Sequence, residues 1–224
     1  MKSLILTVWL FLIINQAHAG SIILPGANPI AISVTSFKEQ HFLATVRQQY
    51  DYSCGSAALA TLLSYQYQNP VSEQEVFKVM WKNGDQQKIR KEGFSLLDIK
   101  HYLLSNGYSA DGYEATLDRL AQAGIPAIAL IRDHGYNHFV VIKGISKDKV
   151  AVGDPSVGAR IIPRVQFEKM RLNHILFVIN NAHDKAVFNA ERDWRIREKA
   201  SPDLANAPNS LYNLTLLRSG PNAF

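Results

Sequence analysis

Residues 48–59 read QQYDYSCGSAAL, and Cys54 in this stretch is the only cysteine of the 224-residue chain. The small residues that follow the thiol predict a helix from Gly55 to Tyr67. A thiol at a helix start lies close to exposed backbone N–H groups, which favour the thiolate that attacks carbonyl carbons. Free cysteine is also among the residue types most often buried and inert. The stretch therefore predicts either a nucleophile or a core cysteine, and other residues must decide between them.

A glutamine six residues before the thiol is a candidate second part of a hydrolytic site. The amide of Gln48 could donate a hydrogen bond to the oxyanion that forms on an attacked carbonyl, and loss of one such donor typically costs about 100- to 1000-fold in rate. Gln49 beside it is the same residue type. A surface role is the alternative for either side chain.

His138 and Asp154 are the candidate base and its orienting group. His138 opens the apolar run 138–142, and Asp154 follows the predicted strand 149–152. A carboxylate that accepts from one imidazole nitrogen fixes the tautomer and stabilises the imidazolium. Each residue has an ordinary alternative, namely a histidine bonded to backbone and a turn aspartate before Pro155. The order of amide donor, thiol, histidine and carboxylate favours a cysteine hydrolase.

His134 and Asp133 raise the alternative of a metal pair with His138. The two histidines are four residues apart, but residues 135–137 read Gly-Tyr-Asn, which predicts a turn rather than a helix, so the i, i+4 ligand geometry of a helix is not expected. The sequence therefore predicts neither a metal site nor a cofactor.

The chain places its helical patterns before its strand patterns. Helices are predicted at residues 55–67, 72–81, 95–107, 116–123 and about 166–171. The second and third are each opened by a capping box, at Ser72 and Ser95. Residues 82–94 are predicted to form a loop. Short β-branched runs predict strands at 125–131, 138–142, 149–152, 159–162 and 175–179. This is an α+β pattern, with N-terminal helices packed on a C-terminal antiparallel sheet of consecutive strands in two layers.

The two ends of the sequence differ from this domain. Residues 1–19 combine Lys2, an apolar stretch and Ala-His-Ala, which is typical of a secretory signal peptide. The apolar stretch is shorter than the about 20 residues of a membrane span, so no stable anchor is expected after cleavage. We expect the domain to cover residues 20–181 and residues 182–224 to be a partly disordered C-terminal extension, with a surface helix over 185–199.

Composition narrows the class of partner. Apolar residues make up 47% of the chain and charged residues 19%, as in ordinary globular proteins. The net charge is +5, but the basic residues are scattered, so no nucleic-acid surface is indicated.

The residues from about Val46 to Asn180 resemble cysteine peptidase family 39, the bacteriocin-processing or double-glycine leader peptidases. The resemblance is carried by Gln48-x5-Cys54-Gly55-x-Ala57-x-Leu59, by His138-Phe139-Val140-Val141 and by Asp154-Pro155. It implies a papain-like fold in which Gln48 is the oxyanion donor, Cys54 the nucleophile, His138 the base and Asp154 the orienting group.

The sequence departs from many family members in two ways. Ser53 stands where many have an acidic residue, and the chain has neither transporter segments nor a nucleotide-binding motif. It is more similar to free-standing exported members, some of which resemble the protease encoded with functional-amyloid secretion systems of Gram-negative bacteria.

This resemblance implies an exported endopeptidase, periplasmic or secreted, that cleaves a polypeptide such as an exported amyloid or a secretion component. The alternatives are a non-catalytic papain-like module that binds a peptide in the envelope and a cell-wall peptide hydrolase.

Overall fold

The computed structural model describes residues 37–195. The predicted signal peptide, residues 20–36 of the predicted domain and residues 196–224 of the predicted extension lie outside this range. Within the described range, no helix is both long enough and apolar enough to span a bilayer.

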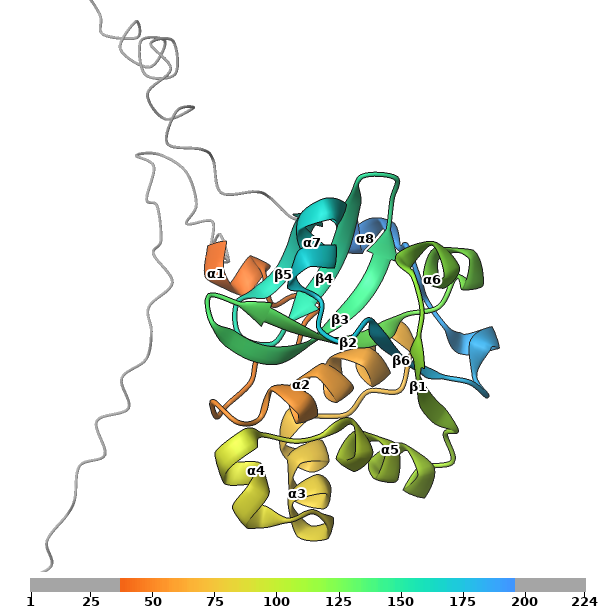
Figure 1. Cartoon of the computed structure of the whole chain (residues 1–224). Coiled ribbons are helices and arrows are strands. Elements are labelled where there is room, and N and C mark those ends of the chain that lie inside the picture. Colours follow the sequence, from red (N-terminus) through yellow and green to blue (C-terminus); the bar gives the residue numbers. More distant parts are fainter. Residues whose placement is uncertain (1–36, 196–224) are drawn as a thin grey trace, which may run out of the picture. The chain divides into compact units, whose positions relative to one another are not determined.

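Helices occupy most of the first half of the described chain (Figure 1). The helices of the whole described range are α1 (Phe37–Gln40), α2 (Cys54–Thr61), α3 (Glu73–Asn83), α4 (Gln86–Glu92), α5 (Leu96–Ser105), α6 (Leu117–Ala123), α7 (Arg164–Met170) and α8 (Glu191–Trp194). A π-helical turn η1 (Leu62–Gln66) and a 3-10 turn η2 (His183–Lys185) accompany them. The predicted capping boxes are both confirmed, because Ser72 accepts from the N–H of Glu75 and Ser95 from that of Asp98.

The sheet contains β1 (Ala110–Glu114), β2 (Ala127–Asp133), β3 (Tyr136–Ile145), β4 (Lys149–Asp154), β5 (Gly158–Pro163) and β6 (Ile175–Ile179). Its order is β1-β6-β2-β3-β4-β5, and every neighbouring pair is antiparallel. The mixed helix and sheet class is therefore as predicted. The expected order of consecutive neighbours holds only from β2 to β5, because β6 returns to lie between β1 and β2.

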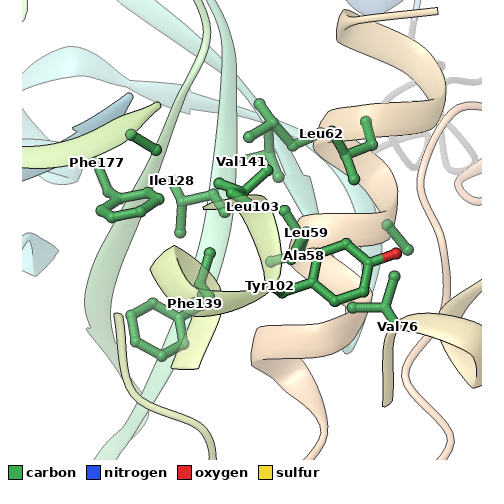
Figure 2. Packing of buried hydrophobic residues seen from close by; sticks show 14 of the residues in the cluster. Ala58, Leu59, Leu62, Val76, Tyr102, Leu103, Ile128, Phe139, Val141 and Phe177 are labelled. Carbon is green, nitrogen blue, oxygen red and sulfur yellow. The ribbon is translucent and has the colours of Figure 1, made fainter. Parts of the chain in front are cut away.

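Both faces of the sheet are covered, so the expectation of two layers is wrong. On one face, α2 and α5 pack on the sheet around Ile128, Phe139, Val141 and Phe177, and α3 packs on these two helices in the same apolar cluster. On the other, α6 and α7 pack against Ala129, Val140, Ile142 and Val152. Successive strand residues belong to opposite faces, and here both are apolar, which is the pattern of strands buried on both sides. Figure 2 shows Leu59 of α2 and Leu62 of η1 on the side of Val141 of β3, and this packing brings the helix of Cys54 onto the strand of His138.

Two further predictions of local structure are wrong. Residues 82–94 are not all loop, because Asp85 caps α4 by accepting from the N–H groups of Gln87 and Lys88. Only Ile89 of α4 is buried, so the segment has no apolar stripe to reveal a helix. The sequence did not predict strand β1, because its residues, ADGYE, are poor strand formers. The segment is a strand because it pairs with β6.

The described part of the predicted extension, residues 182–195, packs on the domain. The amide N–H of Val187 donates to Gln66 O at 2.7 Å, and the carboxylate of Asp193 lies buried 3.1 Å from the Lys143 ammonium of β3. The expected helix over 185–199 is reduced, within the described range, to η2 and the four residues of α8. The helix at 55–67 likewise divides: its α-helical part ends at Thr61, and η1 turns Gln66 toward Asp193, with the two side chains 3.3 Å apart.

Candidate active site

Cys54 is the first residue of α2 and is 8% exposed. The start of α2 packs closely on its surroundings, because a Cβ atom added to Gly55 would lie 2.8 Å from Cβ of Phe94. Burial raises the pKa of the Cys54 thiol, and backbone N–H groups of Phe139, Gly55 and Cys54 itself act in the opposite direction. The helix-start contribution expected from the sequence is thus present, but burial outweighs it. Formation of the thiolate therefore depends on a nearby proton acceptor.

The structure brings His138 and Asp154 together. His138 is the third residue of β3, and Asp154 is the last residue of the neighbouring strand β4. His138 Nε2 lies 3.0 Å from Asp154 Oδ2. Because Asp154 occupies Nε2, Nδ1 is the imidazole nitrogen left to exchange a proton with substrate or thiol. The N–H of Phe139 bonds to the sulfur of Cys54, which sets the thiol beside the backbone that carries His138.

His138 does not open its strand as predicted. Strand β3 begins at Tyr136, and His138 pairs with Ile131 of β2 inside the hairpin. Tyr136 and Asn137 are exposed and polar, so the apolar run in the sequence begins later than the backbone pairing does.

Asp154 is held by hydrogen bonds on both carboxylate oxygens. Oδ1 accepts from the backbone N–H of Ser156 at 2.9 Å and from its hydroxyl at 2.6 Å, and Oδ2 accepts from Arg160 NH1 at 3.1 Å as well as from His138. Burial would raise the pKa of this carboxyl, but the hydrogen bonds and charge of His138 and the bonds from Ser156 lower it to about 2. Asp154 is therefore anionic at any pH at which the site would work.

Gln48, rather than Gln49, faces the site. Its backbone N–H donates to Pro155 O at 3.0 Å, which fixes it beside Asp154. Its side-chain Oε1 is buried and has no hydrogen-bond partner among the residues that the structure describes. Gln49 lies on the exposed surface, 3.4 Å from Gln74. Gln48 also lines the cleft beside His138, so its side-chain amide, unlike that of Gln49, lies where a group that enters the cleft can meet it.

A cleft of about 450 Å³ runs beside these residues. It is lined by Gln48, Asp51, Asp133, His134, Tyr136, Asn137, His138, Ser156 and Val157. Tyr136 and Val157 are strongly exposed, at 78% and 52%. Cys54 itself does not line the cleft and is buried at the start of α2.

Sequence reasoning missed the residues around Asp154. Ser156 and Arg160 bind its carboxylate directly, and Asp133 binds Arg160 NH1 at 2.7 Å. The available signal was Arg160 itself, a charged residue inside the otherwise apolar strand β5.

His134 and Asp133 form an ion pair with each other at 2.8 Å on the turn between β2 and β3. His134 and Gly135 both have positive φ (47° and 87°), so the turn predicted from Gly-Tyr-Asn is present. Among residues 37–195, no three metal-ligating side chains converge.

Comparison with known proteins gives this arrangement its context. The sequence profile of the peptidase C39 family matches residues 43–183. The chain belongs to this family. It is therefore a cysteine peptidase, as the order of Cys54, His138 and Asp154 had indicated.

Two proteins described as "Probable functional amyloid protease FapD" are similar over most of their length. The one from Pseudomonas fluorescens is 39% identical over 180 residues, which is 79% of this chain and 80% of that protein. The one from Pseudomonas aeruginosa is 38% identical over 187 residues, which is 83% of each chain.

Solved peptidase domains share the fold. The peptidase domain of Streptococcus ComA, a bifunctional ABC transporter, aligns with a TM-score of 0.50 at 19% identity and covers 61% of this chain and 96% of the domain. A double-glycine-motif protease from an AMS/PCAT transporter, solved with its leader peptide, aligns with a TM-score of 0.50 at 25% identity, over 60% of this chain and 89% of that one. The papain-like fold expected from the sequence is thus confirmed.

Proposed function

We propose that the protein is an exported endopeptidase that cleaves a secreted or secretion-machinery polypeptide, with Cys54 as nucleophile, His138 as base, Asp154 as orienting group and Gln48 as oxyanion donor. The observation that carries the assignment of roles is the 3.0 Å contact between His138 and Asp154 beside a cysteine that begins a helix. No cofactor is required for this chemistry.

In the proposed reaction, Nδ1 of His138 accepts the proton of Cys54. The thiolate attacks the substrate carbonyl carbon, and the oxyanion receives hydrogen bonds from the Gln48 amide and from the backbone N–H of Cys54. The imidazolium then gives its proton to the leaving amine, which departs as the new N-terminus. Water, activated by His138, hydrolyses the thioester and restores the enzyme.

The buried, anionic Asp154 supports this cycle. A carboxylate fixed on Nε2 keeps the free lone pair at Nδ1 and stabilises the imidazolium that forms in both steps. Because burial raises the pKa of the thiol, the cysteine gains its charge most readily when the proton passes to His138 in the same site.

The class of substrate follows from the relatives. Both curated proteins carry a name that assigns them to functional amyloid, and they align with most of this chain. The proposed substrate is therefore an exported amyloid subunit or another component of its secretion machinery. The signal-like residues 1–19 support a periplasmic location, with full secretion as the other route.

The test is processing of exported amyloid subunits and secretion components in cells that carry the wild-type protein, Cys54→Ala or His138→Ala. We expect a shortened product with the wild type alone, detected by mass spectrometry of the new N-terminus. Gln49→Ala is the matched control for Gln48→Ala, because it removes the same amide from the exposed surface.

Identical products in Cys54→Ala cells would refute the proposal. Capture of an uncut component by both forms would identify a binding module. Release of peptides from purified peptidoglycan would identify a cell-wall hydrolase.

A further inference from the structure

Arg160 links two carboxylates at the edge of the candidate site. Its side chain is 24% exposed, and it comes from β5, the strand next to β4. The NH1 nitrogen alone contacts both partners, Asp154 Oδ2 at 3.1 Å and Asp133 Oδ2 at 2.7 Å. A guanidinium NH₂ group has two N–H bonds, so each bond serves one carboxylate.

The contact with Arg160 completes the hydrogen bonding of Asp154. A carboxylate offers about four lone-pair directions. Ser156 occupies Oδ1 with two bonds, while His138 and Arg160 share Oδ2. With every direction taken, the carboxylate cannot rotate without breaking a bond inside a fully buried pocket.

We propose that Arg160 is a positioning residue of this peptidase: held by Asp133, it fixes Asp154 so that the carboxylate presents Oδ2 to His138. This inference rests on the proposed roles of Cys54, His138 and Asp154, and it adds a residue that does not touch the substrate. Asp133 has two functions in this arrangement, since it anchors Arg160 and balances its positive charge.

The charge of Arg160 also bears on the reactivity of the thiol. The charged and titratable groups around the His138–Asp154 pair are Cys54 from α2, Asp51 from the preceding loop, Asp133 from β2, His134 from the hairpin turn and Arg160 from β5. Arg160 is the one permanent cation of this group, and its charge reaches the thiol through Asp154 and His138, because the guanidinium bonds to the carboxylate. Without that bond Asp154 is held less firmly against His138, so the imidazolium that stabilises the thiolate forms less readily.

The experiment measures alkylation of Cys54 by iodoacetamide from pH 4 to 9 in the mature protein. We expect Arg160→Gln to react about three- to tenfold more slowly at pH 5, with the acid limb of the profile moved to higher pH. Arg160→Lys, which keeps the charge and an N–H donor, should recover most of the rate. Arg164→Gln is the matched control, because Arg164 is 22% exposed and bonds to Asp118 at 2.7 Å away from the cleft.

A second background separates positioning through His138 from a direct effect of charge on sulfur. In His138→Ala, the further change Arg160→Gln should alter the pH 5 rate by less than about twofold, because the group through which Arg160 acts is gone. An equal effect of Arg160→Gln in both backgrounds would overturn the positioning role. So would a rate for Arg160→Gln that matches that of Arg164→Gln.

Asp133→Asn tests the network even where Arg160→Gln does not fold. The asparagine retains an acceptor for Arg160 but loses the charge that anchors the guanidinium, so Asp154 is held less firmly and alkylation at pH 5 should become about two- to threefold slower. An unchanged or faster rate would overturn the inference. If Cys54 is alkylated like a free thiol both in the wild type and in His138→Ala, the proposed function fails as well. If the alkylation rate depends on His138 but not on Arg160, only this inference fails.

Discussion

Asp193→Ala should destabilise the domain severely, because it removes the partner of a buried ammonium group. Lys143 is 1% exposed in its side chain and Asp193 is fully buried, with Nζ and Oδ1 3.1 Å apart. Among residues 37–195, the partners left to Lys143 are the Ala44 carbonyl, as a hydrogen-bond acceptor, and the ring of Tyr65, whose centroid lies 5.5 Å from Nζ. Breaking a buried pair by removing one partner typically costs about 3–5 kcal/mol, since the other charge stays buried without compensation.

The pH dependence of this loss identifies its cause. Burial lowers the pKa of Lys143, and Asp193 opposes that effect, so the variant should lower the pKa further. The unfolded chain then binds more protons than the folded one at neutral pH, and stability rises with pH. The deficit of Asp193→Ala should therefore be largest near pH 7 and shrink toward pH 10, where the folded protein can hold Lys143 neutral.

The assay is urea unfolding of the mature protein followed by circular dichroism at pH 7 and pH 9.5. Glu191→Gln is the matched control: it removes an acid from the same helix, α8, whose pair with Arg195 is exposed, and should change stability little. Lys143→Met combined with Asp193→Leu should recover much of the loss, because the unpaired charge is then absent. A loss below about 1 kcal/mol, or one that does not vary with pH, would refute this reasoning.

Three further predictions concern local structure and the site. Ser95→Ala removes the capping box of α5 and should cost about 1 kcal/mol in urea unfolding, whereas an unchanged midpoint would mean that water replaces the cap. Gly55→Ala forces a Cβ to within 2.8 Å of Phe94 and should cost about 1–3 kcal/mol and slow Cys54 alkylation; full stability with normal reactivity would contradict the close packing. Asp154 has a folded pKa of about 2 against an ordinary 3.8, so its ionised form adds about 2 kcal/mol to the free energy of unfolding above pH 4. This stability is lost as the pH falls from 4 toward 2. The acid-dependent loss should be absent in Asp154→Asn, and an equal loss in that variant would disprove the assignment.

Much of the fold was predictable because local chemistry specifies it. The capping boxes at Ser72 and Ser95 fix two helix starts, and Gly124, with φ of 64°, ends α6 as expected. The β-branched runs identified five strands. Strand β1 and the place of β6 were not predictable, because both depend on pairing between segments far apart in the sequence.

The candidate site shows the same division. The order of residues in the sequence predicted that His138 and Asp154 meet, and the structure brings them to 3.0 Å, while the catalytic roles of Gln48, Cys54, His138 and Asp154 remain predictions. The hydrogen bonds of Ser156 and Arg160 to Asp154 could not be foreseen, since they require the register of β4 against β5 and the turn between them. The same holds for Lys143 and Asp193, whose pairing depends on how residues 182–195 pack beside Gln66 of η1.

The most direct test of the central claim is the rate of Cys54 alkylation against pH in the mature protein and in His138→Ala. The account predicts a rate midpoint below that of a free thiol, about 8.5, and its displacement to higher pH when His138 is removed, because the imidazolium that stabilises the thiolate is lost. A thiol that does not react, or one whose profile is the same in both proteins, would contradict the account.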